Sequence, residues 1–317
     1  MVKGIAFALS ACFIWGLIFV VPELMSGFSS IEVVLGRHFC YGILSVLIFA
    51  KSRFINCCNY PLHVWKKALL LALIMNIILY TFLVLSLRYA TPAVTALILG
   101  LSPITISFWC NFKQKEISYT SLVLPSLAIL LGLIMVNLPH LQSVASDSIT
   151  SYAFGLFSAV VALLAWTWYI VTNARFLKDN PTVLPKEWST VLGVATLFWV
   201  IVLASILGLI FADSALLNKY LVYSEQLQSY IIGSLILGFL CSWVAAALWN
   251  NASFYLPVTM TGQLTIFETI FGVLFVYIFE QKIPLPLECA GIITMLVAII
   301  WGIRVVAKQL PDYEMAH

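Results

Sequence analysis

Residues 257–279 read PVTMTGQLTIFETIFGVLFVYIF, and Glu268 is the only charged residue among them. A helix needs about 20 predominantly apolar residues to cross the hydrocarbon core of a bilayer, so this run is long enough to span it. The whole chain has the same character, because 62% of its 317 residues are hydrophobic and 9% are charged. Soluble globular domains carry about a quarter charged residues, so a soluble fold is excluded.

Nine further apolar runs are separated by charged residues or by clusters of Pro, Asn and Ser. We therefore predict an all-α integral membrane protein with ten transmembrane helices. The longest connections, around 139–151 and 212–229, are too short for an extramembrane domain. The ten predicted spans are Gly4–Val21, Ile31–Ala50, Ala68–Leu87, Pro92–Cys110, Leu122–Leu138, Tyr152–Thr172, Trp188–Ile210, Tyr230–Trp249, Pro257–Phe279 and Leu287–Ile303.

Charge, cysteines and motifs exclude several classes of function. A net charge of +3 in short clusters offers no basic surface for phosphates, so no nucleic-acid partner is expected. The seven cysteines form neither a disulfide framework nor a metal motif. No HExxH, GxSxG or Walker motif occurs, and all four aspartates lie outside the predicted spans. We predict no enzyme, no metal and no cofactor. Any uphill transport would then be coupled to an ion gradient or to exchange.

The distribution of cations predicts the orientation, because cytoplasmic loops are enriched in Lys and Arg. Assigning the loops alternately from a cytoplasmic N-terminus places twelve cations inside and three outside. Both termini are therefore predicted to be cytoplasmic. The inside set is Lys3, Lys51, Arg53, Lys66, Lys67, Lys113, Lys115, Arg175, Lys178, Lys186, Arg304 and Lys308, and the outside set is Arg88, Lys219 and Lys282.

Sparse internal matches indicate a repeat, although apolar segments also align by chance. We predict two five-helix halves, residues 1–145 and 146–317. Because each half holds an odd number of spans, the second would enter the membrane with the opposite orientation. A shift of 151 residues lays Gly4 on Gly155 and Trp15 on Trp166, and a shift of 164 lays Val94-Thr95 on Val258-Thr259 and Glu116 on Glu280.

The order of several short motifs across the spans resembles the drug/metabolite transporter superfamily, in its EamA-like branch. The resemblance covers nearly the whole chain, and each motif alone is weak. In the first half they are Phe13-Ile14-Trp15-Gly16, Arg37, Leu87-Arg88-Tyr89-Ala90-Thr91-Pro92-Ala93, Ser102-Pro103 and Lys115-Glu116. In the second half they are Ala165-Trp166-Thr167-Trp168-Tyr169, Leu248-Trp249-Asn250-Asn251-Ala252, Phe267-Glu268 and Glu280.

This resemblance implies a carrier of the bacterial cytoplasmic (inner) membrane, with ten helices in two inverted halves, that exports amino acids or similar metabolites. The chain departs from the family at one place. The family often has Glu-Pro in the ninth span, whereas here Thr269 follows Glu268. The proline kink expected at Pro103 in the fourth span would then have no counterpart.

Glu268 is the strongest functional candidate. It stands eleven residues from each end of its span, where an acid costs about 2.5 to 3.5 kcal/mol on insertion scales. Burial penalises the ionised carboxylate, so we expect Glu268 to exchange a proton or to bind an ammonium group. The alternative is a permanently protonated Glu that donates to a neighbouring helix.

Helical spacing suggests which residues accompany Glu268 in a substrate cavity. Residues three, four or seven positions away share its face, and other spans carry polar and aromatic stripes at the same spacing. Such walls attract ammonium groups through cation–π contacts, although the aromatic residues would equally suit a core or an interfacial belt. The predicted binding residues are Trp15, Asn76, Tyr80, Trp166, Tyr169, Asn173, Trp243, Asn250, Thr261, Thr265 and Glu268, with Gly272 as a structural residue on the same face.

Arg37 is the only cation within a predicted span. It would lie about 9 Å below the external surface, whereas Glu268 would lie roughly 18 Å deep at 1.5 Å per residue. It would act as a structural anchor, as a gating partner of Glu23 or Glu32, or as a group that binds a substrate carboxylate. The depth mismatch favours the structural and gating roles.

The leading hypothesis is a secondary transporter that exports a small amphipathic metabolite, an amino acid or a derivative, by alternating access. Its partners would be the substrate, the lipid bilayer and possibly a proton, and the sequence predicts no oligomeric state. An importer of a cationic metabolite, such as a choline-like or S-adenosyl compound, would suit the same cavity. A non-transporting scaffold or sensor would leave the intramembrane charges unexplained.

Overall fold

Helices are the regular structure of the computed structural model, which describes residues 1–25, 27–51, 60–90, 95, 98–114, 118–141, 149–210, 220–281 and 283–309. Within these ranges, seven helices are long and apolar enough to cross a membrane, and Val2–Gly16 and Thr120–Val136 are shorter apolar helices. The predicted all-α membrane fold is confirmed to this extent. The first part of the fourth predicted span, the Lys115-Glu116 motif, Arg53, Lys219 and Lys282 lie outside the described residues.

The helices follow one another through short connections in the order that the apolar runs predict. Three of the long helices are divided into consecutive segments. The segments follow in chain order, and those of one divided helix are given together. They are α1 (Val2–Gly16) with η1 (Leu17–Phe19) and η2 (Val21–Leu24); α2 (Ser30–Lys51); α4 (Leu62–Ala72) with η3 (Leu73–Leu79) and α5 (Tyr80–Tyr89); α7 (Ser102–Gln114); α8 (Tyr119–Leu141); α9 (Ile149–Asp179); α10 (Pro185–Ile210); α12 (Glu225–Ile236) with η4 (Leu237–Val244) and α13 (Ala245–Tyr255); α14 (Val258–Leu264); α15 (Ile266–Glu280); and α16 (Pro286–Gln309).

Several helices extend beyond their predicted ends, and in α9 and α4 buried contacts continue there. Helix α9 runs to Asp179 rather than Thr172, since Phe176 and Leu177 are buried in the main core. Helix α4 begins at Leu62 rather than Ala68, since Pro61 takes the N-cap position and Val64 is buried. Proline suits a helix start because it has no amide to leave unpaired.

The ninth span, expected to be continuous, is interrupted at Thr265. Helix α14 ends at Leu264 and α15 begins at Ile266. The Thr265 hydroxyl donates to the carbonyl of Gly262 at 2.7 Å, and the backbone amide of Glu268 donates to the carbonyl of Thr265 at 3.1 Å. Pro103 lies in the first turn of α7, so it starts a helix rather than bending one. The turn at Thr265 needs no proline, so the absence of a proline after Glu268 does not make the ninth span a regular α-helix throughout.

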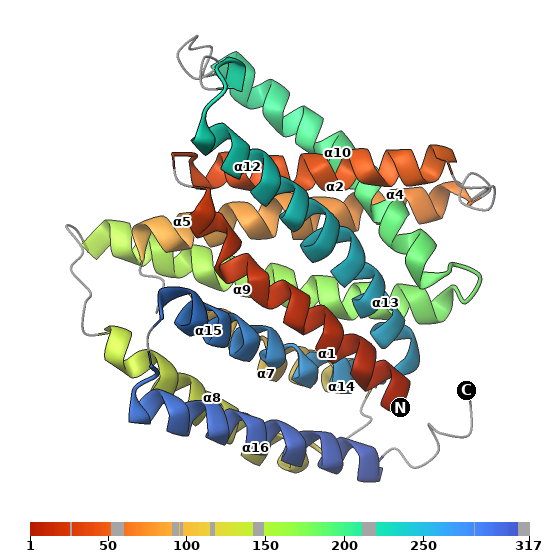
Figure 1. The fold of residues 1–317 in the computed structure, drawn as a ribbon. Coiled ribbons are helices and arrows are strands. Elements are labelled where there is room, and N and C mark those ends of the chain that lie inside the picture. Colours follow the sequence, from red (N-terminus) through yellow and green to blue (C-terminus); the bar gives the residue numbers. More distant parts are fainter. Residues whose placement is uncertain are drawn as a thin grey trace.

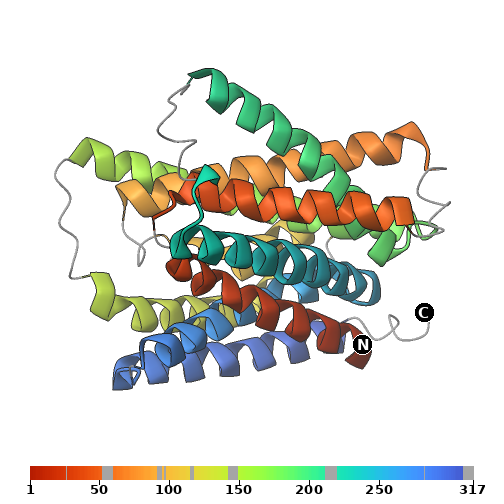
Figure 2. The same cartoon turned by 45° about the horizontal axis from the view of Figure 1, so that its top comes forward.

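The helices form a bundle in which sequence-distant partners lie side by side (Figure 1). The main helix pairs are α8 with α16, α2 with α10, α1 with α13, α5 with α9, α1 with α15, and α7 with α14. Helices α1 and α9 run in opposite directions (Figure 1), and α1 begins at the same end of the bundle at which α16 finishes, as Figure 2 also shows.

Helices α8 and α16 approach closely at two glycines. A Cβ on Gly132 would lie 2.8 Å from the carbonyl oxygen of Gly291, and a Cβ on Gly291 would lie 2.7 Å from the carbonyl oxygen of Gly132. Small residues allow such backbone contact between membrane helices, where no hydrophobic driving force holds them together. The pair Gly132 and Gly291 therefore sets the distance between α8 and α16.

We predict that Gly132→Ala destabilises the protein by about 1–3 kcal/mol, the usual cost of overpacking. The matched control is Gly208→Ala, because a Cβ at Gly208 meets nothing within 4 Å. Thermal unfolding in detergent should show a lower Tm for Gly132→Ala and an unchanged or higher Tm for Gly208→Ala, since Ala favours a helix more than Gly does. Equal Tm values for the two variants would contradict this packing.

Candidate functional site

Arg37 lies at the centre of a buried polar cluster and is 4% exposed. Its Nε donates to the hydroxyl of Ser242 at 2.9 Å, its Nη1 donates to the hydroxyl of Tyr80, and its Nη2 donates to the carbonyl of Cys241 at 3.4 Å. The guanidinium also lies 4.8 Å from the centroid of the Tyr80 ring. Arg37 thus joins α2 to α5 and η4 through neutral partners.

Two π-helical turns, η3 and η4, bring polar groups to this cluster. In η4 the amide of Ala245 donates to the carbonyls of Leu240 and Ser242 rather than to the carbonyl of Cys241. The Cys241 carbonyl accepts instead from Arg37 and, at 2.8 Å, from Trp15 Nε1. Because π-helical turns occur frequently at functional sites, this geometry makes η4 part of the candidate site.

The turn η3 contributes Asn76, which is 8% exposed. Asn76 Nδ2 donates to the hydroxyl of Thr196 in α10 at 2.7 Å. This bond uses one of the four hydrogen-bonding positions of the amide side chain. Asn76 can therefore still bond to a ligand in the adjoining cavity.

A cavity of about 20 Å³ adjoins this cluster near the middle of the bundle. It has room for about one or two water-sized groups. Its lining contains one cationic side chain and no carboxylate. The lining residues are Trp15, Arg37, Tyr41, Leu71, Ala72, Met75, Asn76, Tyr169, Leu192, Cys241, Ser242 and Ala246.

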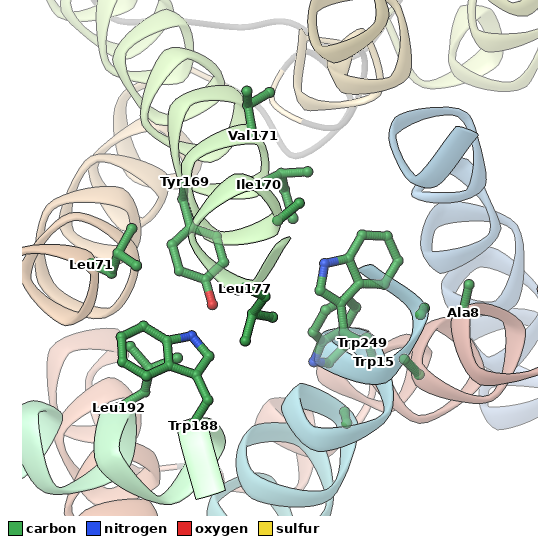
Figure 3. Packing of buried hydrophobic residues seen from close by; sticks show 14 of the residues in the cluster. Ala8, Trp15, Leu71, Tyr169, Ile170, Val171, Leu177, Trp188, Leu192 and Trp249 are labelled. Carbon is green, nitrogen blue, oxygen red and sulfur yellow. The ribbon is translucent and has the colours of Figure 1, made fainter. Parts of the chain in front are cut away.

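Aromatic side chains form one wall of the cavity and continue behind it. The ring centroids of Trp15 and Trp166 lie 6.0 Å apart, those of Trp15 and Trp249 lie 5.3 Å apart, and Trp166 stacks on Tyr169 at 6.0 Å. In Figure 3 the Tyr169 ring extends from α9 toward Trp188 and Leu192, whereas Trp15 and Trp249 lie together across the space. The structure thus brings the predicted residues Trp15, Trp166 and Tyr169 together.

Glu268 lies beside this cavity without lining it. It is partly buried in the first turn of α15 and interacts electrostatically with Arg37, Tyr80 and Cys12. Its carboxylate has no hydrogen-bond partner among the residues that the structure describes. Glu268 follows the single-residue turn at Thr265, whose backbone keeps helical angles (φ −59°, ψ −26°).

Three predicted residues serve instead to connect helices. Asn173 Nδ2 donates to Asn250 Oδ1 at 2.8 Å, and Asn250 Nδ2 donates to the Ser189 hydroxyl at 2.8 Å. Trp188 Nε1 donates to Asn173 Oδ1 at 2.7 Å. Trp243 Nε1 donates to the hydroxyl of Thr190 at 3.1 Å. Asn173 and Asn250 are therefore bonded to each other and to α10 rather than directed into the cavity.

The other predicted residues of the ninth span contact the backbone or a neighbouring helix. The hydroxyls of Thr261 and Thr265 donate to the carbonyls of Val258 and Gly262, at 2.8 and 2.7 Å. The Thr265 hydroxyl also lies 3.5 Å from the Ser102 hydroxyl at the start of α7. A Cβ on Gly16 would lie 3.0 Å from the amide nitrogen of Gly272, which places Gly272 at the contact between α1 and α15.

The sequence reasoning missed four residues at the site: His38, Tyr41, Thr196 and Ser242. Tyr41 lies one helical turn after Arg37 and shares its face, so helical spacing from Arg37 would have identified it. His38 is 1% exposed and packs edge-on against the Tyr80 ring at 5.1 Å. Ser242 reaches the site through the π-helical turn, which no α-helical spacing would reveal.

The fold and the buried ionisable cluster define a multi-pass helical membrane protein with a polar site inside its apolar bundle. Residues 2–138 match the profile of the EamA-like transporter family. Over these residues the chain is similar to that family, and the resemblance predicted from its sequence is confirmed there. The first part of the chain therefore resembles a membrane transporter.

An individual protein and a solved structure illustrate what this chain is similar to. The inner membrane protein YtfF of Escherichia coli (strain K12) is 28% identical over 309 residues, which cover 96% of each protein. A solved structure described only as "Crystal structure of protein" aligns over 100% of both chains with a TM-score of 0.71 and 17% identity. At that identity the second likeness supports the fold alone.

We predict that Asn173→Ala lowers the stability by about 1–3 kcal/mol, because it leaves the buried Trp188 indole N–H without an acceptor and the Asn250 Oδ1 without a donor. The control is Asn251→Ala, since Asn251 Nδ2 donates only to the carbonyl of Ala247 in its own helix, at 2.7 Å. The Tm of each variant in detergent, together with that of the Asn173→Ala/Asn250→Ala double variant, measures the coupling. Additive effects of the two substitutions would contradict a shared network.

Proposed function

We propose that the chain is a secondary transporter that exports a small amphipathic metabolite, an amino acid or a derivative, by alternating access. The observation that carries this proposal is the cavity beside Arg37, which lies amid apolar helices. The match of residues 2–138 to a family of transporters supports it. Ionisable groups at membrane depth are costly and mark substrate or ion pathways. Neither a packing role nor a purely structural role requires a cavity beside the cation.

Repeated backbone features support two halves, residues 1–145 and 146–317, related by inverted symmetry. The π-helical turns η3 and η4 begin at Leu73 and Leu237, which are 164 residues apart. The same separation relates the turn at Leu101, which precedes α7, to the break at Thr265, which precedes α15. It is also the shift that aligns the fourth and ninth spans in sequence, so helix breaks and sequence matches point to one repeat.

Helix packing supports the same symmetry. Gly4 at the start of α1 meets Tyr255 and Leu256 after α13, whereas Gly155 near the start of α9 meets Tyr89 and Ala90 after α5. These contacts are equivalent under the proposed repeat. The helices α2 and α10, and α8 and α16, also pack as pairs of equivalents. Such inverted repeats allow the two halves to exchange conformations, which opens a central site to each side in turn.

Glu268 is proposed to carry the coupling proton or to receive the substrate ammonium group. Its position at the start of α15 follows the arrangement of transporters in which helices broken within the membrane form the binding site. The electrostatic interaction with Arg37 links it to the cavity. A proton or an ammonium group on Glu268 would therefore change the field at Arg37.

The importer of a cationic metabolite is the weaker alternative. A choline-like or S-adenosyl cation would have to enter a cavity lined by Arg37 and by no carboxylate. Coulomb repulsion in a medium of low dielectric constant opposes that arrangement. A zwitterion or an anion meets no such penalty.

The protein is proposed to lie in the bacterial inner membrane with both termini in the cytoplasm. The printed name of the relative YtfF supports the inner membrane. The excess of Lys and Arg on one side supports the orientation, as does the common end of the bundle at which α1 begins and α16 finishes.

We predict that Glu268→Gln abolishes the pH dependence of efflux from membrane vesicles loaded with radiolabelled amino acids, because amide side chains cannot exchange a proton. The wild type should respond to an imposed pH gradient. The control is Glu225→Gln, which alters an exposed acid in the first turn of α12. Flux of the Glu268→Gln variant that still follows the pH gradient would remove Glu268 from the coupling mechanism.

The orientation predicts the behaviour of reporter fusions. A fluorescent reporter that matures only in the cytoplasm should give signal when fused after Gln309 or between Asp179 and Pro185. A periplasmic phosphatase should be active in the connection between α15 and α16 and inactive at the two cytoplasmic positions. Phosphatase activity at Gln309 would reverse the proposed orientation.

A further inference from the structure

The cavity beside Arg37 has the chemistry of a carboxylate subsite. We propose that it binds the carboxylate group of the transported molecule, with Arg37 as the main binding residue and Tyr169 as a second donor. This inference rests on the proposed function, because it concerns the molecule that is transported. It gives Arg37 a substrate-binding role, in place of the anchoring or gating role that its predicted depth in the membrane favoured.

Charge balance is the first argument. Arg37 is almost fully buried, and its three hydrogen bonds go to two hydroxyls and a carbonyl, none of which neutralises it. No described residue forms a salt bridge with it, and Glu268 interacts with it electrostatically without a direct ion pair. An unpaired buried cation is strongly unfavourable. A substrate carboxylate would supply the missing negative charge.

Unused donors are the second argument. A guanidinium has five N–H groups, and the described bonds of Arg37 use three of them. Tyr169 lines the same cavity, and its hydroxyl bonds to none of the described residues. The Asn76 amide has a second N–H. A group that accepts several hydrogen bonds at once, such as a carboxylate, would satisfy all three residues.

The way in which Arg37 is held favours a planar acceptor. Ser242 and the Cys241 carbonyl fix one edge of the guanidinium, and Tyr80 supports it through a hydrogen bond and through its ring. A guanidinium with a fixed plane presents paired N–H groups that match the two oxygens of a carboxylate. A spherical anion such as chloride would use only one of these donors well.

The size and surroundings of the cavity limit what it accepts. About 20 Å³ admits a group the size of a carboxylate but not an entire metabolite. The apolar lining of Leu71, Met75 and Leu192 would contact the carbon skeleton next to that group. With Glu268 near the cluster as the acidic pole, the site would hold a zwitterion between opposite charges.

Thermal unfolding of the full chain in lipid nanodiscs tests the subsite. The probes are sodium acetate, sodium propionate and an equimolar mixture of the protein L-amino acids, compared at equal ionic strength with sodium chloride and ethylammonium chloride. A ligand that binds only the folded state raises the Tm. We expect the carboxylates to raise the Tm, and chloride and ethylammonium to leave it unchanged. Equal stabilisation by ethylammonium or chloride, or no stabilisation by any carboxylate, would overturn the assignment.

Variants assign the effect to the named residues. Arg37→Gln should eliminate the stabilisation by carboxylates, whereas Arg175→Gln, at the far end of α9, should retain it. Arg37 also joins three helical segments, so its substitution affects folding as well as binding. Tyr169→Phe is a second variant that breaks no hydrogen bond among the described residues. It should weaken acetate binding by about three- to tenfold, the usual effect of one hydrogen bond. Unchanged acetate binding by both Arg37→Gln and Tyr169→Phe would contradict the proposal.

Transport measured in parallel separates this inference from the proposed function. Stabilisation by carboxylates without flux of any amino acid would support the carboxylate subsite and contradict the proposed transport function. Flux of amines that lack a carboxylate, without carboxylate stabilisation, would retain the transporter and refute the subsite.

Discussion

The hydrocarbon core of the membrane imposes one constraint on this chain: every backbone N–H and C=O at that depth needs a partner within the protein. Long helices satisfy it, which is why the apolar runs of the sequence appear as helices. The informative places are those where the α-helical pattern changes, at η3, at η4 and at Thr265. At η4 and at Thr265 side chains donate to carbonyls of the altered turns, and these places lie around Arg37 and Glu268.

The carbonyl of Cys241 illustrates how this constraint produces a site. The π-helical turn moves the amide of Ala245 away from it, and Trp15 and Arg37 donate to it instead. The same interaction therefore joins α1, α2 and η4 and holds the guanidinium against the cavity. A buried cation that is fixed by neutral partners remains available to an external anion. Stability of the bundle and selectivity of the proposed site thus depend on one carbonyl.

Hydropathy predicted the membrane class and the helices well, because burial in lipid requires long uninterrupted apolar runs. The side chains at the site were harder to predict. Helical spacing identified Asn173 and Asn250 as inward-facing, but it could not show that they would bond to each other. It missed Ser242, because a π-helical turn changes which residues share a face. It also gave no sign of the break at Thr265, where no proline occurs and a threonine hydroxyl bonds to the preceding turn.

The central claim is that the cavity at Arg37 is reached in turn from both sides of the membrane. Cys241 lines that cavity, so a variant that keeps Cys241 as its only cysteine can report access directly. The measurement is the labelling rate of Cys241 by a small membrane-impermeant thiol reagent, applied to right-side-out and to inverted vesicles. The account predicts labelling from both faces, slowed by a bound carboxylate. Labelling from one face only, or from neither, would contradict it.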